Sequence, residues 1–332
     1  MFASHAFCVA LAATLFLPGV EAAFALESTR PEIRQFVDEL VRDEGFDRAG
    51  LSKVMAKAEK KQAILDAMSR PAERTVPWFE YRQRFMTDKR IGEGVDFWRA
   101  HAQRLETIED ADLAAATAGI LGVETSYGRL TGRYRVLDAL ATLAFDYPPR
   151  ADFFRNELRQ FLLLTRDEEI DPSTALGSYA GAMGAPQFIP SSYRNFAVDA
   201  DGDGHRDLWS NWDDVIGSVA NYLRMHGWRA GEAVIVDAEV DAKDAEHFGP
   251  TRLELSDTVQ SLRDKGARFE TDMAATAPAM MIVAQGKDGL VYRVGFNNFY
   301  AISRYNRSSM YSMAVHDLGE AIQAALRDAA RQ

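Results

Sequence analysis

Residues 178–209 constrain the fold of this chain more than any other stretch, because they join a run of small residues to an acidic loop. The first half, SYAGAMGAPQFIP, carries too little bulk for a packed core element. Glycine and alanine let a backbone approach a ligand closely, so this half is expected to line a binding surface. The second half contains DADGDG at 199–204, with carboxylates at alternate positions before a glycine. That spacing is typical of a loop that binds a hard cation.

The acidic loop matches the first nine positions of an EF-hand loop, with carboxylates at positions 1, 3 and 5 and a backbone carbonyl at position 7. The corresponding residues are Asp199, Asp201, Asp203 and His205. Position 12 is Ser210 instead of a bidentate glutamate, so Asp213 or Asp214 would have to complete the shell. Three carboxylates this close repel one another without a cation, which favours a metal site over an acidic turn without metal. Because every donor is a hard oxygen, calcium is favoured over zinc.

Length and charge limit the classes of function. A chain of 332 residues with 47% hydrophobic residues is long enough for two or three compact units. The formal net charge of -11 leaves no overall basic face to neutralise phosphates. Nucleic acid is therefore excluded as the expected partner, and so is an electrostatic membrane anchor.

The first 25 residues resemble a secretory signal peptide, with an apolar run at 6–17 followed by small residues. Cleavage is expected after Ala25, with Ala22 as the alternative, although the usual basic residues are missing from the start. The apolar run is shorter than the roughly 20 residues that a span needs, so no transmembrane anchor is expected in the mature chain. The only cysteine, Cys8, follows a phenylalanine where a lipid-attachment site would need a small residue. The mature protein would then have no cysteine, which suits an oxidising compartment.

Hydrophobic periodicity predicts a mainly α-helical protein with a small β insert, an α+β fold. Residues 70–90, rich in proline, arginine and aromatics, are predicted to form a connection and not a regular helix. The sequence GKDG at 286–289, between two apolar runs, indicates a β-hairpin. The predicted domains are an N-terminal helical domain at 26–108, a helical core at 109–228 and 297–332, and a strand-containing insert at 229–296.

Glu124 is the strongest candidate for acid–base chemistry. It lies near the end of an alanine-rich helix, one turn from Ile120, Leu121 and Tyr127. Apolar surroundings favour the protonated carboxyl group and would raise its pKa, as a general acid requires. The alternative is a solvated glutamate at a helix end. The sequence contains no nucleophile elbow, zinc-binding histidine pair or glycine-rich phosphate loop. The aromatic stretch 296–311 suits either core packing or a sugar groove.

Six motifs in order resemble the membrane-bound lytic murein transglycosylase B family and its soluble relatives. The similarity covers essentially the whole mature chain. The motifs are GVETSYGR (122–129), ALATLAFDYPPR (139–150), SYAGAMGAPQFIPSSY (178–193), VDADGDGHRDLW (198–209), IGSVANYL (216–223) and SRYNRSSMYSMAV (303–315).

The resemblance implies a lysozyme-like catalytic core that cleaves peptidoglycan between N-acetylmuramic acid and N-acetylglucosamine. The muramoyl C6 hydroxyl attacks its own C1 and leaves a 1,6-anhydro sugar. A hydrolase needs a second carboxylate for water or for a covalent intermediate, whereas here the nucleophile belongs to the substrate. One glutamate, acting first as acid and then as base, is therefore enough.

The resemblance also assigns roles to individual residues. Glu124 matches the catalytic acid/base, Ser178 the serine that orients its carboxylate, and Gln187 the glutamine that contacts the sugar beside the scissile bond. The tyrosines that match those lining the groove are Tyr222, Tyr305 and Tyr311. Alignment on the following V-I-G-S favours Asp214 as the last ligand of a structural calcium ion, with Asp213 remaining open. The expected signal peptide implies export to the periplasm, and the missing lipid-attachment site favours the soluble branch of the family.

Two other classes of function remain open from the sequence. One is a muramidase that uses water, which would need a second carboxylate such as Asp146 near Glu124. The other is a peptidoglycan-binding or scaffold protein without catalytic activity, which loss of a catalytic motif would indicate. All the catalytic motifs named above are present.

Overall fold

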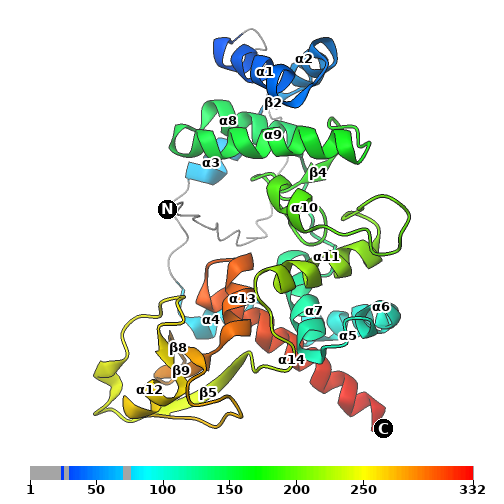
Figure 1. Cartoon of the computed structure of the whole chain (residues 1–332). Helices are drawn as coiled ribbons and strands as arrows, with labels where there is room; N and C mark the ends of the chain where they lie inside the picture. Colours follow the sequence, from blue (N-terminus) through cyan, green and yellow to red (C-terminus); the bar gives the residue numbers. More distant parts are fainter. Residues whose placement is uncertain (1–23, 26–29, 70–75, 332) are drawn as a thin grey trace. The chain divides into compact units, whose positions relative to one another are not determined.

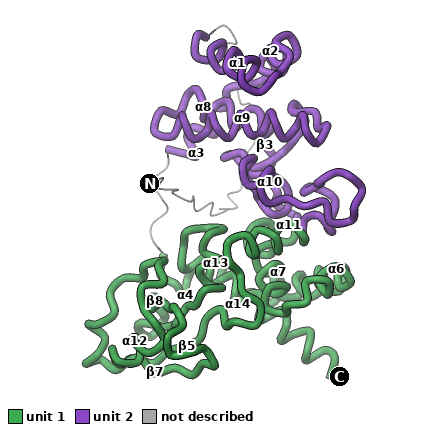
Figure 2. The backbone as a smooth tube through the Cα atoms, in the orientation of Figure 1, with its two compact units in different colours: residues 1–11, 75–127, 216–332 green, residues 12–74, 128–215 purple. Residues whose placement is uncertain are grey.

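The computed structural model describes residues 24–25, 30–69 and 76–331. These residues divide into two compact units, each of which combines segments from separate parts of the chain (Figure 2). Unit 1 comprises 76–127 and 216–331, and unit 2 comprises the described residues up to 69 together with 128–215. The boundary near residue 215 falls inside helix α11 (Trp212–Met225).

Unit 2 is mainly helical and also contains short two-residue strands (Figure 1). Its helices are α1 (Pro31–Glu44), α2 (Arg48–Ala56), α3 (Gln62–Ser69), α8 (Val136–Asp146), α9 (Ala151–Asp167) and α10 (Pro190–Phe196). Its strands pair as β1 (Phe24–Ala25) with β2 (Glu59–Lys60), and β3 (Tyr134–Arg135) with β4 (Leu176–Gly177). Helices α8 and α9 lie side by side, separated by the 3-10 turn η1 (Pro148–Arg150).

Helix α1 shows how the sequence sets local structure in unit 2. Proline at position 31 has the fixed φ that a first helical residue needs. Its apolar residues Ile33, Phe36, Val37 and Leu40 recur at helical spacing and form a buried stripe, and Leu40 is fully inaccessible. The helix ends at Gly45, whose φ of 68° is accessible to glycine at little cost.

Unit 1 combines helices with a five-stranded antiparallel sheet. Its helices are α4 (Trp78–Gln83), α5 (Asp88–Ala100), α6 (Ala102–Glu106), α7 (Ala111–Thr125), α12 (Val259–Asp264), α13 (Asn297–Tyr305) and α14 (Ser309–Ala330), with the 3-10 turn η2 (Ala245–His247). Helices α7 and α14 pack closely because glycines lie at their contact. A Cβ at Gly119 would stand 2.2 Å from the carbonyl oxygen of Val315, and one at Gly319 would stand 2.5 Å from that of Ala115.

The sheet of unit 1 has the strand order β6-β8-β9-β5-β7. Its strands are β5 (Ile235–Val240), β6 (Asp257–Thr258), β7 (Ala267–Arg268), β8 (Pro278–Gln285) and β9 (Leu290–Gly295). The predicted hairpin at 286–289 is confirmed, because Gln285 pairs with Leu290 and Gly286 N donates to Gly289 O at 2.8 Å. Helix α12 packs against the sheet, and Val259, Leu262 and Phe296 form part of their shared core (Figure 1).

The predicted mainly helical fold with a small β region is confirmed. The prediction for residues 70–90 is wrong in part, because 78–83 form α4 and α5 begins at Asp88. Buried Trp78 anchors the short helix, and the Thr87 side chain caps the next by accepting a hydrogen bond from Arg90 N at 3.1 Å. The three-domain division stays a prediction.

The predicted signal peptide at residues 1–25 lies outside the described residues, except for the backbone of β1. Its removal after Ala25 or Ala22 stays a prediction.

Candidate active site and cation loop

Helix α7 positions Glu124 in its last turn. The helix begins where the Asp110 side chain accepts a hydrogen bond from Leu113 N at 2.9 Å, and it ends at two residues with left-handed backbones. Ser126 has a φ of 53° and Tyr127 one of 57°, which is uncommon for residues other than glycine. Such backbone strain is found most often at functional sites, where surrounding contacts hold it in place. Here the Tyr127 ring stacks on Phe97, with centroids 5.3 Å apart.

The carboxyl group of Glu124 has the electrostatic character of a general acid. Burial raises its pKa from 4.5 to about 7, although the residue keeps some exposed surface. The hydroxyl of Tyr311 donates a hydrogen bond to Glu124 Oε1 at 2.7 Å, and this bond lowers the pKa in part. The expectation of a raised pKa is confirmed, and the alternative of a solvated helix-end glutamate does not describe this residue.

The three predicted groove tyrosines belong to the same unit as Glu124. Tyr311 is almost fully buried on α14, and this burial raises its pKa, with a further contribution from the charge of Glu124. Burial raises the pKa of Tyr305 at the end of α13, and the charge of Glu124 adds to this effect. The Tyr222 ring meets the Tyr305 ring edge-on at 4.7 Å, and its hydroxyl donates to Arg304 O at 2.7 Å. Unit 1 therefore groups one carboxyl with three tyrosines.

Ser178 lies in a tight turn of unit 2 and is only 3% exposed. Its Oγ accepts hydrogen bonds from Ala182 N at 3.0 Å and from Ala180 N at 3.3 Å. These two bonds use the acceptor capacity of the hydroxyl and leave its hydrogen for donation. The backbone of the small-residue run therefore orients the Ser178 hydroxyl as a donor.

Gln187 ends a second turn of the small-residue run in unit 2, at 184–187, and has a left-handed backbone with a φ of 53°. Its Nε2 donates to Thr131 O at 3.0 Å and to Gly184 O at 2.9 Å. Its Oε1 is buried and has no hydrogen-bond partner among the described residues. A buried acceptor without a partner costs free energy unless a ligand supplies a donor. Gln187 thus presents a fixed acceptor.

The acidic loop brings together the first three predicted ligands. The carboxylates of Asp199, Asp201 and Asp203 are exposed, and one oxygen from each lies within 4.8 Å of the others. Asp199 accepts hydrogen bonds from Gly202 N at 2.7 Å, Asp203 N at 3.1 Å and Gly204 N at 2.8 Å. These bonds lower its pKa and keep it ionised. The donor set of hard oxygens fits calcium.

Asp214 lies at the base of the loop and is fully buried. Its Oδ1 accepts a hydrogen bond from Ala200 N at 2.7 Å, and its Oδ2 accepts one from Asp207 N at 2.8 Å. The carboxylate thus joins the two arms of the loop and does not belong to the group of three exposed carboxylates. Its role as a cation ligand, like the ligand role of the His205 carbonyl, stays a prediction.

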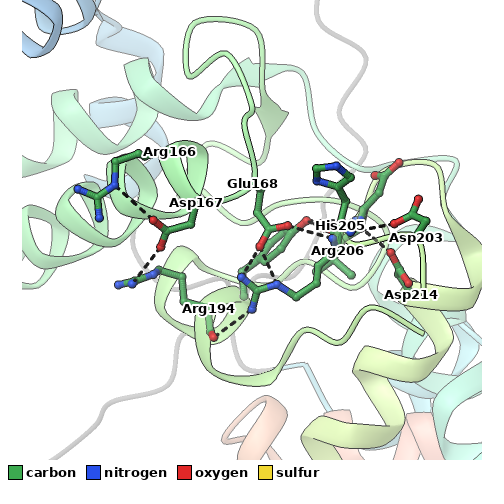
Figure 3. A network of polar contacts seen from close by, with 11 residues as sticks. Arg166, Asp167, Glu168, Arg194, Asp203, His205, Arg206 and Asp214 are labelled. Atoms are coloured by element: carbon green, nitrogen blue, oxygen red, sulfur yellow. Dashed lines mark hydrogen bonds and ion pairs between the residues drawn. The ribbon is translucent and has the colours of Figure 1, made fainter. Parts of the chain in front are cut away.

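An ion pair that the sequence analysis did not predict anchors the loop to Glu168, the residue directly after α9 (Figure 3). The Arg206 guanidinium donates to Glu168 Oε1 at 2.7 Å, and Arg206 N donates to Glu168 Oε2 at 3.0 Å. Arg206 also donates to Arg194 O at 3.3 Å. The two residues are 38 positions apart, so no local pattern predicts that they pair. The one signal in the sequence was the position of Arg206 inside the loop motif.

The loop also contacts the turn that carries Gln187. Leu208 O accepts a hydrogen bond from Ala185 N at 2.9 Å. Gly184, with a φ of 65°, lies so close that a Cβ there would stand 2.1 Å from the same carbonyl oxygen. Only glycine fits this position, both for space and for backbone conformation. Within unit 2, the conformation of the acidic loop is therefore coupled to that of the backbone around Gln187.

Comparison with known proteins identifies the family. The model of the transglycosylase SLT domain matches residues 28–320. The chain is 39% identical over 309 residues to membrane-bound lytic murein transglycosylase B of Escherichia coli K12, covering 90% of this chain and 84% of that protein. The chain therefore belongs to the transglycosylase SLT domain family, which confirms the resemblance seen in the sequence.

Solved structures agree with this assignment. The soluble lytic transglycosylase SltB1 of Pseudomonas aeruginosa is 48% identical, with a TM-score of 0.85 over 89% of this chain and 99% of that one. The Escherichia coli lytic transglycosylase Slt35 in complex with calcium is 38% identical, with a TM-score of 0.83 over 91% and 96%. Pseudomonas aeruginosa SltB3 in complex with NAG-anhNAM-pentapeptide is 28% identical, with a TM-score of 0.79 over 88% and 79%.

Among the helices that the structure describes, none combines the length and the apolar character needed to cross a membrane.

Proposed function

We propose that this member of the family is a lytic transglycosylase that cleaves the β-1,4 bond between N-acetylmuramic acid and N-acetylglucosamine in peptidoglycan and leaves 1,6-anhydro ends. The observation that carries the proposal is the carboxyl group of Glu124, whose pKa of about 7 suits it to both donate and accept a proton near neutral pH. The names of the relatives, which are lytic transglycosylases, support the same activity.

The reaction needs one carboxyl group in two roles. Protonated Glu124 donates its proton to the glycosidic oxygen as the bond to C1 breaks. The muramoyl C6 hydroxyl then attacks C1, and the Glu124 carboxylate accepts the hydroxyl proton. The proton balance closes without water, and the enzyme returns to its protonated state. The Tyr311 hydroxyl, 2.7 Å from Glu124 Oε1, stabilises the ionised form between the two transfers.

Ser178 and Gln187, both in the small-residue run of unit 2, are proposed to assist this chemistry. Ser178 has a hydroxyl hydrogen left to donate, which supports its role in orienting the Glu124 carboxylate. Gln187 has a buried oxygen without a partner among the described residues, which supports its role as an acceptor for a sugar hydroxyl or N–H group. The proposed lining of the groove by Tyr222, Tyr305 and Tyr311 is supported by their grouping with Glu124 in unit 1.

The hydrolytic alternative has less support. Asp146, the second carboxylate considered from the sequence, is engaged by two cations in unit 2. Its Oδ1 lies 3.1 Å from Arg30 and 3.3 Å from Lys60. These contacts favour a structural role for Asp146.

We further propose that the acidic loop binds a structural calcium ion through Asp199, Asp201, Asp203, the His205 carbonyl and Asp214. The calcium complex of a relative and the clustered carboxylates support this proposal. The ion would neutralise the loop and hold its conformation, and it would take no part in bond cleavage.

Export to the periplasm, with cleavage after Ala25 or Ala22, is proposed from the apolar N-terminal run and from the location of the substrate outside the cytoplasm. Fractionation of cells that express the full chain would test it. Recovery of the uncleaved chain in the cytoplasm alone would contradict it.

Product analysis tests the reaction directly. Purified murein sacculi are digested with the protein, and the released muropeptides are analysed by mass spectrometry. Anhydro-muramic acid ends, lighter than reducing ends by one water, are the expected products. Reducing muramic acid ends would support the hydrolase instead, and binding to sacculi without cleavage would support a scaffold protein.

A further inference from the structure

Tyr127 follows Glu124 by three residues and takes no part in the reaction proposed for this site. Its side chain is buried, and its backbone has a φ of 57° directly after Ser126, whose φ is 53°. A bulky residue with a left-handed backbone is an outlier that persists only where its surroundings hold it in place. The surroundings of Tyr127 therefore show what fixes the end of α7.

The hydroxyl of Tyr127 lies in a space bounded by two glycines of unit 1. A Cβ at Gly94 on α5 would stand 2.4 Å from the hydroxyl oxygen, and one at Gly122 on α7 would stand 2.7 Å from it. Both distances are too short for a real contact, so a larger residue at either position would collide with the hydroxyl. The hydroxyl donates a hydrogen bond to Arg90 O at 3.2 Å. The facing surfaces of α5 and α7 thus leave room for this one hydroxyl and supply its acceptor.

The side chain of Arg90 makes a second bond between the same two helices, in the opposite direction. Its guanidinium donates to Gly122 O, which also accepts a hydrogen bond from Ser126 N at 3.2 Å. Tyr127 N donates to Leu121 O at 3.0 Å and closes the end of the helix. The last turn of α7 is therefore held both by its own backbone bonds and by α5.

This last turn carries the proposed catalytic carboxyl group. Glu124 extends from α7, and its Oε1 accepts the bond from Tyr311 on α14 at 2.7 Å. A misplacement of about 1 Å at a reacting group can cost about 100-fold in rate, even when its cause lies away from the chemistry. A contact that fixes the backbone beside Glu124 can therefore control the reaction without touching the substrate.

We propose that Tyr127 is a positioning residue for Glu124, an inference that rests on the proposed transglycosylase function. Its hydroxyl, bonded to Arg90 O, holds the left-handed end of α7 and so directs the carboxyl group towards the glycosidic oxygen. Because the contact acts through the backbone, its loss should slow bond cleavage and leave the binding of the glycan nearly unchanged.

The kinetic test compares the wild-type chain with Tyr127→Phe, which keeps the ring stacked on Phe97 and removes only the hydroxyl. The substrate is a soluble peptidoglycan glycan strand of defined length, and kcat and KM are both measured. In Tyr127→Phe, kcat should fall at least tenfold while KM changes less than twofold. The matched control is Tyr292→Phe, the same chemical change at a half-buried tyrosine on β9 of unit 1, which should keep both constants within twofold.

Hydrogen exchange measured by mass spectrometry reports on the end of α7 independently of activity. The amides of Ser126 and Tyr127 donate to carbonyls of α7, so their exchange measures how often this end opens. Exchange in the segment 125–129 should be at least tenfold faster in Tyr127→Phe and unchanged in Tyr292→Phe. The melting temperature of each variant shows that it is folded.

Faster exchange with an unchanged kcat would make the contact merely structural and overturn the proposal. A loss of kcat without faster exchange would also overturn it, because the hydroxyl would then not act through the helix end. A loss of kcat/KM that comes from KM alone would assign Tyr127 to substrate binding instead. Reducing ends from the wild-type chain would refute only the transglycosylase function, because a lower kcat in Tyr127→Phe would still support the positioning of Glu124.

Discussion

Glu124 in unit 1 and Asp199 in unit 2 carry the same chemical group in opposite electrostatic settings. Glu124 has one described hydrogen bond, from Tyr311, and burial raises its pKa to about 7. Asp199 is exposed and accepts three backbone N–H bonds, which lower its pKa. The first carboxyl can exchange a proton near neutral pH, whereas the second stays ionised and suits a cation. The two groups are chemically alike, so their surroundings set the difference. Loss of solvent raises the pKa into the range that suits proton transfer, and N–H donors lower it into the range that suits cation binding.

The largest expected effect follows from removing the proton of Glu124. Glu124→Gln keeps the size of the side chain but has no proton to exchange, so sacculus cleavage should fall by about 10²–10⁴-fold. The release of soluble muropeptides per unit time measures this loss. The control is Glu106→Gln, an exposed glutamate of the same unit, which should keep the full rate. Unchanged cleavage by Glu124→Gln would remove Glu124 from the mechanism.

The same substitution should stabilise the protein at alkaline pH. Because the folded-state pKa of Glu124 is raised, the folded protein binds more protons than the unfolded chain between about 4.5 and 7, and stability falls as the pH rises through this window. The loss is at most about 3 kcal/mol above pH 7. Glu124→Gln should therefore have the higher free energy of unfolding at pH 8, measured by urea denaturation. At pH 4 the two proteins should be nearly equal, and a difference that does not depend on pH would refute this explanation.

Removal of the cation tests the other carboxyl environment. A ligand that binds only the folded state stabilises it, so chelation should lower the melting temperature by about 5 °C at saturating calcium. Asp199→Asn should reduce this response, and the exposed hairpin control Asp288→Asn should retain it. The same melting temperature with calcium and with chelator would exclude a calcium site.

The smallest effect separates the hydrogen bond of Glu124 from its burial. The bond from Tyr311 lowers the pKa of Glu124, so Tyr311→Phe should raise that pKa. Glu124 must be protonated in the free enzyme, and the alkaline limb of kcat/KM should therefore move to higher pH, by less than about one unit. The pH dependence of cleavage measures the shift. Movement of the limb to lower pH would contradict the assigned direction.

Local sequence patterns predicted much of the fold, because the residues that determine a helix face or a hairpin turn lie close together in the chain. The stripe of α1 follows from the 3.6-residue period, and the hairpin at 286–289 follows from two glycines between apolar runs. Helix α4 was missed because Trp78 is held by burial and not by a periodic pattern. The short helix thus depends on tertiary contacts that no local sequence window contains.

The candidate site was predictable only in part. The spacing of Asp199, Asp201 and Asp203 indicated the acidic group directly, since three ligands two residues apart converge in a loop with a glycine turn. The Arg206–Glu168 ion pair and the loop-closing bonds of Asp214 were not predicted. Both depend on elements brought together by folding.

The sequence by itself determined the family, the helical character of the chain and the position of the acidic loop, because these are properties of order and spacing along the chain. Only the tertiary structure decided that Glu124 is desolvated beside Tyr311 and that Leu208 contacts the turn of Gln187. The reason is physical. The pKa of a carboxyl group depends on which atoms replace water around it, and those atoms come from distant parts of the chain.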